Sequence, residues 1–179
     1  GGRRENCMYK IGEYISYGMA GVCEIIDITT LNMDGVSKER LYYILMPCGD
    51  SGGRLFTPVD NNKVYMRPIL SKEEADALIR EIPEIGQLWV GNDKLREESY
   101  RNAMKSGDCR EWIRIIKTLY LRKQQRIQQG KKTTAMDEKY LRLAEERLYS
   151  ELSIPLGIPK EDMADYITEQ IRASEPQQI

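Results

Sequence analysis

The hydrophobic pattern of this 179-residue chain changes once, at Ser71, and this change limits the possible folds more than any other feature. Before Ser71, short runs rich in Ile, Val, Tyr and Leu are separated by glycine-containing turns. After Ser71, apolar residues recur at helical spacing. The first pattern is typical of β-strands and the second of amphipathic helices. We therefore expect an α+β chain in which a small β domain is followed by an all-α domain.

The β region, residues 8–70, contains five predicted strands, in residues 10–17, 21–28, 40–47, 54–59 and 64–69. Asp34-Gly35 separates the second strand from the third and indicates a turn. Three prolines stand where a strand would end or lie at an edge, since neither place needs their missing N–H: Pro47, Pro58 and Pro68. Five short strands so closely spaced predict a small β barrel. Residues 1–7 are expected to form a tail outside this barrel.

The helical region, residues 71–179, begins with a predicted capping box. Ser71 is its N-cap and Glu74 its third helical residue, just before the first apolar positions. This first helix should end before Pro83, because the residue that precedes a proline avoids the α conformation. Asn92 can then cap a second helix.

The third helix is the longest that the pattern predicts, with Asp108 as its N-cap and an end near Gln129. A fourth helix should start at residues 133–134 and break at the IPLGIP sequence of residues 154–159, and a last helix should span Lys160–Ala173. Apolar residues of the third helix follow helical spacing and predict a core-facing stripe of Trp112, Ile113, Ile116, Leu119, Tyr120 and Ile127.

The net charge of −1 conceals one strongly basic segment. Residues 91–133 contain 12 Lys and Arg against 5 Asp and Glu, a balance of +7, whereas residues 134–179 contain 5 against 10, a balance of −5. Such a local concentration of positive charge is expected where a protein meets a polyanion. A solvated helix surface can have the same composition, so charge alone leaves both interpretations open.

Several kinds of active site are disfavoured by what the sequence contains. There is no histidine, which excludes His-assisted catalytic triads and His-bound metals. The four cysteines form no close C-x-x-C pair of the kind that binds zinc. GMAG at residues 18–21 precedes a β run and lacks the helix of a phosphate-binding loop, so we expect a turn with positive φ there. DSGG at residues 50–53 is also interpreted as a turn. We expect no enzyme, cofactor, metal or small-molecule substrate.

No apolar run approaches the roughly 20 residues that span a bilayer, and no signal peptide opens the sequence. We therefore expect a cytoplasmic protein without a membrane partner.

Trp89 stands out in the linker between the first two predicted helices, between Gly86 and Gly91. A tryptophan in such a place is either a packing anchor or an apolar wedge that inserts at a nucleic-acid base step, next to a helix that contacts phosphates. Trp112 lies on the apolar stripe and is expected to be buried. The residues around Trp89 leave its two roles open.

Six motifs occur in a fixed order along the chain. The β region contains MYKIGEYISYGMAGVC at residues 8–23, YYIL at 42–45 and TPV at 57–59. These three resemble the RNA-polymerase-interacting domain that CarD-type transcription regulators share with transcription-repair coupling factors. The helical region contains WVGNDKLR at 89–96, SGD at 106–108 and LYLRK at 119–123, which resemble the helical domain of CarD regulators. No helicase motif G-x-x-x-x-G-K-[ST], as a coupling factor would have, occurs in the chain.

The resemblance implies a Tudor-like barrel that docks on the β subunit of bacterial RNA polymerase. It also implies a helical domain that contacts promoter DNA at the upstream fork of the transcription bubble, where a tryptophan of the family wedges into the minor groove. The implied function is control of open-complex stability at initiation, without catalysis. From this resemblance we expect Trp89 to be the tryptophan that acts as the wedge.

Residues for both contacts follow from this assignment. For promoter DNA we expect Trp89 together with cations of the basic segment, namely Lys94, Arg96, Arg101, Arg110, Arg114, Lys117, Arg122 and Lys123. For RNA polymerase the candidates are Arg40 and Arg54, which are charged positions flanking predicted strands.

Two other functions are compatible with the same residues. A protein-only adaptor would use its basic helices to meet an acidic protein surface. An RNA-binding module is also conceivable because small barrels with basic surfaces bind RNA, although the strands here lack an aromatic-rich face.

Overall fold

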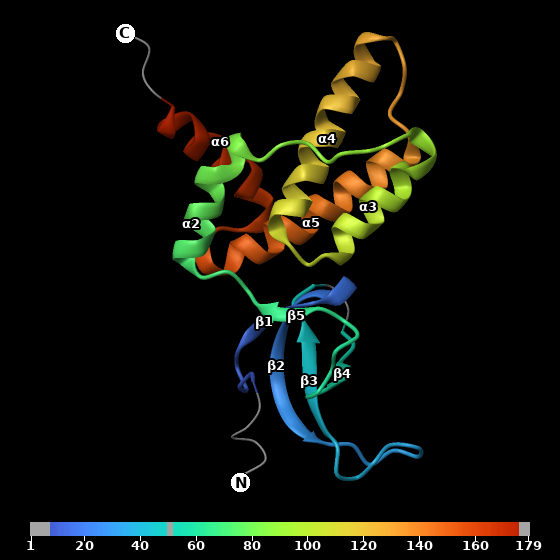
Figure 1. Cartoon of the computed structure of the whole chain (residues 1–179). Helices are drawn as coiled ribbons and strands as arrows, with labels where there is room; N and C mark the ends of the chain where they lie inside the picture. The colour runs from blue at the N-terminus through green and yellow to red at the C-terminus, as the bar shows by residue number, and fades with distance from the viewer. Residues whose placement is uncertain (1–7, 50–51, 176–179) are drawn as a thin grey trace. The chain divides into compact units, whose positions relative to one another are not determined.

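A computed structural model of the chain describes residues 8–49 and 52–175 (Figure 1). The described residues form two compact units, a β unit that ends at Ile69 and a helical unit that begins at Leu70. Two sequence predictions concern residues outside the described ones: the tail of residues 1–7, and the first half of the turn at residues 50–53.

The β unit is an antiparallel five-stranded sheet with the strand order β4-β3-β2-β1-β5. The strands are β1 (Tyr14–Tyr17), β2 (Gly21–Thr30), β3 (Leu41–Pro47), β4 (Leu55–Pro58) and β5 (Met66–Pro68). All five predicted strands are present, and each of the three prolines is the last residue of its strand. A register shift between Ile25 and Asp27 of β2 forms a bulge, which bends a strand and strengthens its twist. Among the described residues, β4 and β5 are the edge strands.

The core of the β unit lies on one face of the sheet. Its residues are Tyr9, Ile15, Cys23, Ile25, Ile28, Tyr43 and Leu45. Several of them are cross-strand partners, such as Ile15 with Cys23 and Ile25 with Leu45, so their side chains meet on the same face. Tyr9 closes this core, since its ring contacts that of Tyr43 edge-on at 5.8 Å between centroids.

The turn between β1 and β2 confirms the interpretation of GMAG. Gly18 and Gly21 have φ of +46° and +75°, which glycine adopts without strain. The residues Gly18–Ala20 form a single 3-10 turn, η1, and β2 follows at once. Glycine is also required at position 18 for space, because a Cβ there would collide with Cγ1 of Val64.

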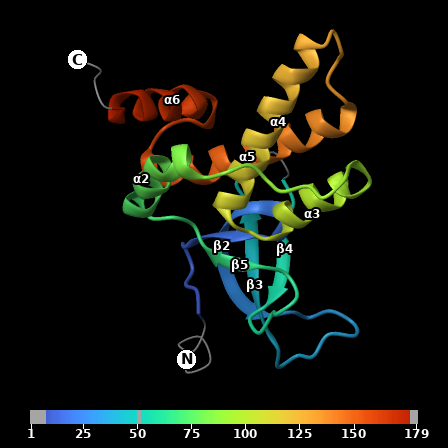
Figure 2. The same ribbon diagram turned by 45° about the horizontal axis from the view of Figure 1, so that its top comes forward.

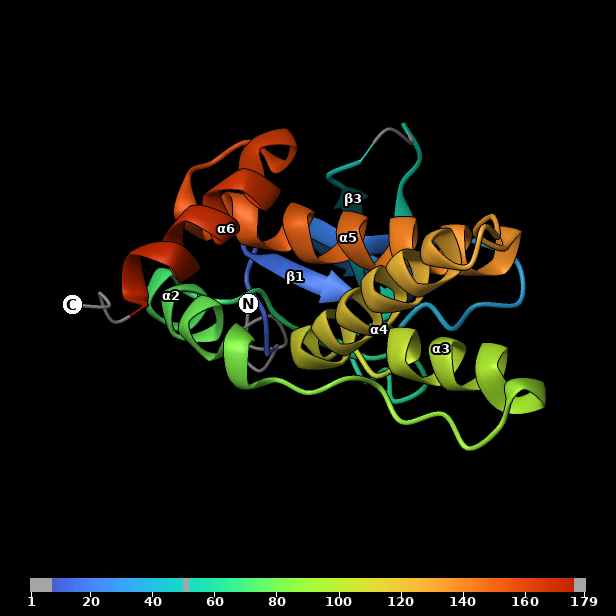
Figure 3. The same ribbon diagram turned by 90° about the horizontal axis from the view of Figure 1, so that it is seen from above.

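The helical unit contains five helices and three short 3-10 turns among its described residues. The helices are α2 (Lys72–Glu81), α3 (Arg96–Lys105), α4 (Cys109–Gln128), α5 (Ala135–Leu156) and α6 (Met163–Ser174). The 3-10 turns are η2 (Ile82–Glu84), η3 (Asp93–Leu95) and η4 (Lys160–Asp162). Seen along the view of Figure 3, α4 crosses α5, α3 lies beside α4, and α2 lies beside α6. None of the described helices combines the length and apolar composition that crossing a bilayer requires.

Local sequence signals place three helix starts correctly, whereas Asn92, the predicted cap of the second helix, caps the 3-10 turn η3 and α3 begins at Arg96. The Ser71 hydroxyl accepts from the Glu74 N–H, and the Glu74 carboxylate accepts from the Ser71 N–H, both at 3.1 Å, so the capping box is confirmed. Asp108 caps α4 and Thr134 caps α5, as predicted. The first helix ends at Glu81, before Pro83, again as predicted.

The predicted break of the fourth helix at residues 154–159 is confirmed, although its first proline does not end the helix. The helix α5 continues through Pro155 and ends at Leu156, and Gly157 is its C-cap with φ of +66°. Packing outweighs the cost of the proline here, since Leu148 and Leu152 anchor this end of α5 in the core.

The predicted apolar stripe of α4 is partly wrong. Trp112, Ile113 and Leu119 are buried, but Tyr120 and Ile127 are 56% and 59% exposed. Ile115, which the prediction omitted, is fully buried. The buried residues of α4 all lie between Cys109 and Leu119, so the buried stripe ends before Tyr120 and does not extend to Ile127 as predicted.

Candidate nucleic-acid interface

The linker that carries Trp89, residues 85–92, is attached to α4 by a threonine. Oγ1 of Thr118 accepts a hydrogen bond from the Leu88 N–H at 2.8 Å. The same hydroxyl donates to the Arg114 carbonyl, one helical turn back, at 2.7 Å. A hydroxyl can donate one bond and accept another, so Thr118 joins the linker backbone to the helix backbone. Figures 1 and 2 show the linker crossing α4 between α2 and α3.

A lysine attaches the start of the same linker. The Lys117 ammonium group donates to the carbonyl oxygens of Ile82 and Ile85, which lie just beyond the C-terminus of α2. Carbonyl groups at such a helix end carry partial negative charge, so a cation is favourable there. Burial, and then the nearby positive charge of Arg114, lower the pKa of Lys117. Lys117 thus contacts the protein's own backbone.

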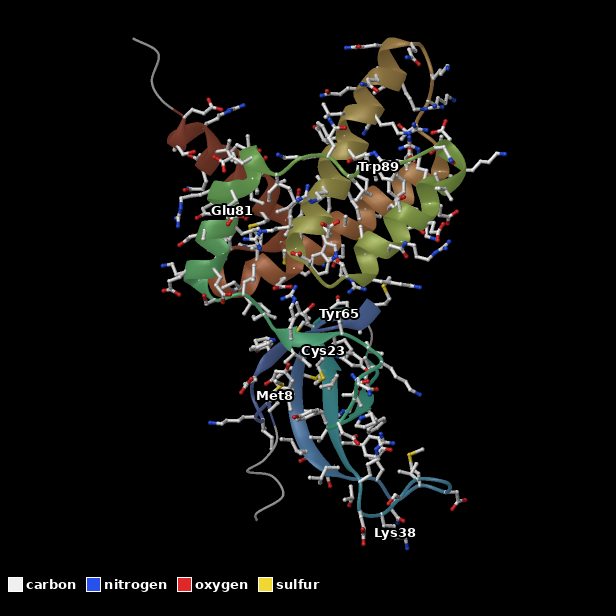
Figure 4. The ribbon with its side chains drawn as sticks, in the orientation of Figure 1. Met8, Cys23, Lys38, Tyr65, Glu81 and Trp89 are labelled. Carbon is white, nitrogen blue, oxygen red and sulfur yellow. The ribbon has the colours of Figure 1, made fainter. Side chains whose placement is uncertain are left out.

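Trp89 projects from this linker and is 83% exposed (Figure 4). Its neighbours Leu88 and Val90 are half-buried, so side chains alternate between α4 and solvent along the linker. The indole lies over Gly91, where an added Cβ would come within 3.0 Å of the ring. Trp112, in contrast, is fully buried. Trp89 is therefore not a packing anchor within the helical unit.

A pocket of about 240 Å³ lies between the linker and α4. Leu88 and Val90, the two neighbours of Trp89, line it on the linker side. Arg96 and Arg122, two of the predicted DNA-contacting cations, line it as well. The structure thus brings these two arginines to the linker that carries the exposed tryptophan.

Arg96 and Arg122 both belong to a largely buried polar network. Nε of Arg122 lies 2.6 Å from Oδ2 of Asp137, whose side chain is almost completely buried. The Tyr100 hydroxyl lies 3.5 Å from the other oxygen of Asp137 and accepts from Nη1 of Arg96 at 2.9 Å. A buried carboxylate is strongly destabilising without its charged partner. These two arginines therefore connect α3, α4 and α5.

Arg96 has a further acidic partner, and three of the other six predicted cations also have acidic partners within the helical unit. The ion pairs are Arg96–Asp93 at 3.0 Å, Arg101–Glu97 at 3.5 Å, Arg110–Glu81 at 2.9 Å and Arg114–Glu111 at 3.2 Å. Lys94 and Lys123 are exposed and form no ion pair at contact distance among the described residues, although the charge of Lys123 acts on Glu145 and opposes the burial that raises the pKa of this carboxyl group. Of the predicted cations, these two are the most available to bind an external anion.

Three further lysines of the basic segment share this property, and the residue-level prediction omitted them. Lys105, Lys131 and Lys132 are exposed, and their ammonium groups have no acidic partner in the part of the chain that the structure describes. The sequence contains a local signal that separates paired from unpaired cations. Arg96, Arg101 and Arg114 each follow an acidic residue by three or four positions, a spacing that favours an ion pair on a helix.

The two candidates in the β unit differ in their surroundings. Arg40, just before β3, pairs with Asp60 at 3.2 Å and lies 5.8 Å from the centre of the Tyr42 ring. Arg54 is exposed directly before the edge strand β4. Phe56, on that strand, is 48% exposed. Unpaired backbone groups and an exposed aromatic ring make β4 a surface on which a partner strand can add.

Comparison with known protein families gives two matches, one for each unit. Residues 9–70 match the family model described as CarD-like/TRCF RID domain. Residues 90–168 match the model described as CarD, C-terminal domain, and this match begins directly after Trp89. Together they cover most of the chain, in the order in which the motifs occur. A comparison with curated proteins gives no match.

Proposed function

The chain belongs to the CarD-type family of RNA-polymerase-interacting transcription factors, and on that premise we propose that it bridges RNA polymerase and promoter DNA. The β unit docks on the β subunit of a bacterial polymerase, in the cytoplasm. The helical unit contacts promoter DNA at the upstream fork of the transcription bubble and changes the lifetime of the open complex. The protein acts through binding alone, without a cofactor.

The observation that carries the DNA-binding part is the exposure of Trp89. Leaving 83% of an indole in water forgoes the large stabilisation that burying an aromatic ring provides. Such a side chain is suited to an apolar contact with a partner. Unstacked base steps accept apolar wedges of this kind, and binding then depends on distortion of the duplex.

We assign the phosphate contacts to cations of the basic segment that contains α4 and follows Trp89. Lys94, five residues after Trp89, and Lys123 on α4 are the first candidates, because they break no internal ion pair when they bind a phosphate. The paired arginines 96, 101, 110, 114 and 122 would have to exchange a carboxylate for a phosphate. We assign Lys117 to support of the linker, since its ammonium group already contacts two carbonyl groups.

Polymerase docking is assigned to the edge strand β4. Backbone N–H and C=O groups on a free edge can extend a sheet of the partner, while side chains beside the edge select the partner. Arg54 and Phe56 are placed to do so, and Arg40 is a second candidate that would first release Asp60.

Separating the two units tests this division of labour. Residues 8–69 have a core of their own, so this fragment and residues 70–179 can each be tested against the immobilised polymerase β subunit and against a promoter duplex. We expect the first fragment to retain polymerase and the second to retain DNA, with salt-dependent affinity.

Three results would contradict the proposal. DNA binding by the β fragment alone would reverse the assignment. A helical fragment that prefers RNA would favour an RNA-binding module. A helical fragment that binds an acidic protein and neither nucleic acid would favour an adaptor.

A further inference from the structure

We infer that Thr118 is a positioning residue, which holds the linker of residues 85–92 so that Trp89 points away from α4. This inference rests on the proposed contact between Trp89 and DNA, and it assigns a role to a side chain that never meets the DNA. Thr118 is 8% exposed and lies on α4, far along the sequence from Trp89.

The argument begins with the backbone of the linker. Residues 85–92 lie in no helix or strand, so the hydrogen bonds of a regular element do not fix them. The Leu88 N–H is instead bound to Oγ1 of Thr118 at 2.8 Å. This bond fixes the peptide unit between Gln87 and Leu88, one residue before that of Trp89.

The orientation of the indole follows from that fixed peptide. Leu88 and Val90 are both half-buried and both line the pocket beside α4, so Trp89 between them is directed to solvent. Rotation of the linker about its own axis would exchange these positions and bury the indole. The Thr118–Leu88 bond opposes such a rotation at the residue next to Trp89.

Thr118 is itself held in a single arrangement. Its hydroxyl hydrogen is used in the bond to the Arg114 carbonyl at 2.7 Å, which leaves an oxygen lone pair for the Leu88 N–H. Lys117, the preceding residue, fixes the start of the linker through the carbonyl groups of Ile82 and Ile85. Two adjacent residues of α4 thus fix the linker at two separate points.

The first test needs no substitution and no DNA. In the wild-type protein, amide hydrogen exchange of Leu88 should be roughly two- to tenfold slower than that of Trp89 and Val90, as expected for one net hydrogen bond. Equal exchange at the three amides would overturn the inference.

The second test uses Thr118→Val, which keeps the shape of the side chain and removes the acceptor. In protein labelled with 5-fluorotryptophan, the resonance of Trp89, assigned with Trp89→Phe, should shift or broaden, while that of Trp112 stays in place. Thr118→Ser keeps a hydroxyl and should restore the wild-type spectrum. Thr168→Val is the matched control, because Thr168 makes the same bond to a carbonyl one turn back, at 2.9 Å, but contacts no linker. An unchanged Trp89 resonance in Thr118→Val would overturn the inference.

The third test separates positioning from general stability. On a synthetic duplex with an unpaired fork, Thr118→Val should lower the affinity roughly two- to tenfold. In the Trp89→Ala background the same substitution should change nothing further, since its effect passes through Trp89. An equal loss with and without Trp89 would overturn the inference. If the wild type does not prefer the fork, the proposed function fails, and the exchange and fluorine tests still decide the role of Thr118.

Discussion

Trp89 and Trp112 are the two tryptophans of the chain, and their surroundings are opposite. One is 83% exposed on a linker and the other is fully buried on α4. The consequences of removing each ring should therefore be opposite too.

We expect Trp112→Ala to lower the free energy of unfolding by about 3–5 kcal/mol, the usual cost of truncating a buried tryptophan. Trp89→Ala should change it by less than about 0.5 kcal/mol, because folding does not bury this ring. Urea unfolding of both full-length variants, followed by circular dichroism, measures the difference. A loss of several kcal/mol in Trp89→Ala would mean that the indole is part of a core.

Tyr149 provides a pH-dependent probe of the helical unit. Burial, and then the negative charges of Glu145 and Tyr120, raise the pKa of Tyr149 to about 12, from an ordinary value of 10.0. Below pH 10 the phenol is protonated in both the folded and the unfolded chain, so its titration costs no stability there. Between pH 10.0 and about 12 the unfolded chain releases the proton while the folded chain keeps it, so stability is lost as the pH rises.

Tyr149→Phe should therefore reduce the loss of stability across this alkaline range. Unfolding free energies of the wild type and the variant, measured at a series of pH values from neutral to alkaline, should keep a constant difference up to about pH 10, and the wild type should then lose stability relative to the variant as the pH rises. Two parallel curves would show that Tyr149 titrates alike in both states.

At the scale of elements, features that depend on neighbouring residues could be predicted from the sequence. Features that depend on tertiary packing could not. Ser71 and Glu74, Asp108, and Thr134 act on backbone groups within a few residues, and each was found where predicted. The exposure of Tyr120 depends on which other helices reach that end of α4, which the periodicity of one helix does not contain.

The candidate interface shows the same division. The prominence of Trp89 and the basic character of residues 91–133 could be read from the sequence. The partners of Arg110 and Arg122 lie 29 and 15 residues away, so no local pattern indicates that these cations are already paired. The hydroxyl of Thr118 likewise meets a backbone group 30 residues away.

The basic segment can be tested by its salt dependence. If Lys123 contacts a phosphate, Lys123→Ala should reduce the magnitude of the slope of log K against log salt by about 0.9 and weaken binding to unrelated sequences equally. Lys72→Ala is a suitable control, because Lys72 is also exposed but lies on α2, outside the basic segment. Fluorescence anisotropy titrations of a labelled duplex at several salt concentrations give both slopes. Equal slopes for the two variants would mean that Lys123 is not part of the DNA-contacting surface.

At the scale of the whole molecule, the one strongly basic segment belongs to a single unit. The β unit is nearly neutral, and the strongly basic residues 91–133 lie entirely within the helical unit. A factor that joins a protein partner to DNA needs such a separation, because a basic polymerase-docking surface would also bind DNA nonspecifically. We therefore expect that a change in one unit leaves binding by the other unit intact.

The lifetime of a promoter open complex tests the central claim most directly. Polymerase, promoter and saturating wild-type or Trp89→Ala protein would be assembled, and dissociation followed after addition of a competitor. We predict that Trp89→Ala still binds polymerase but shortens the lifetime roughly five- to a hundredfold, as expected for the loss of one aromatic contact with a base, and that Trp89→Phe is intermediate. An unchanged lifetime with Trp89→Ala, at full occupancy of polymerase, would contradict the account.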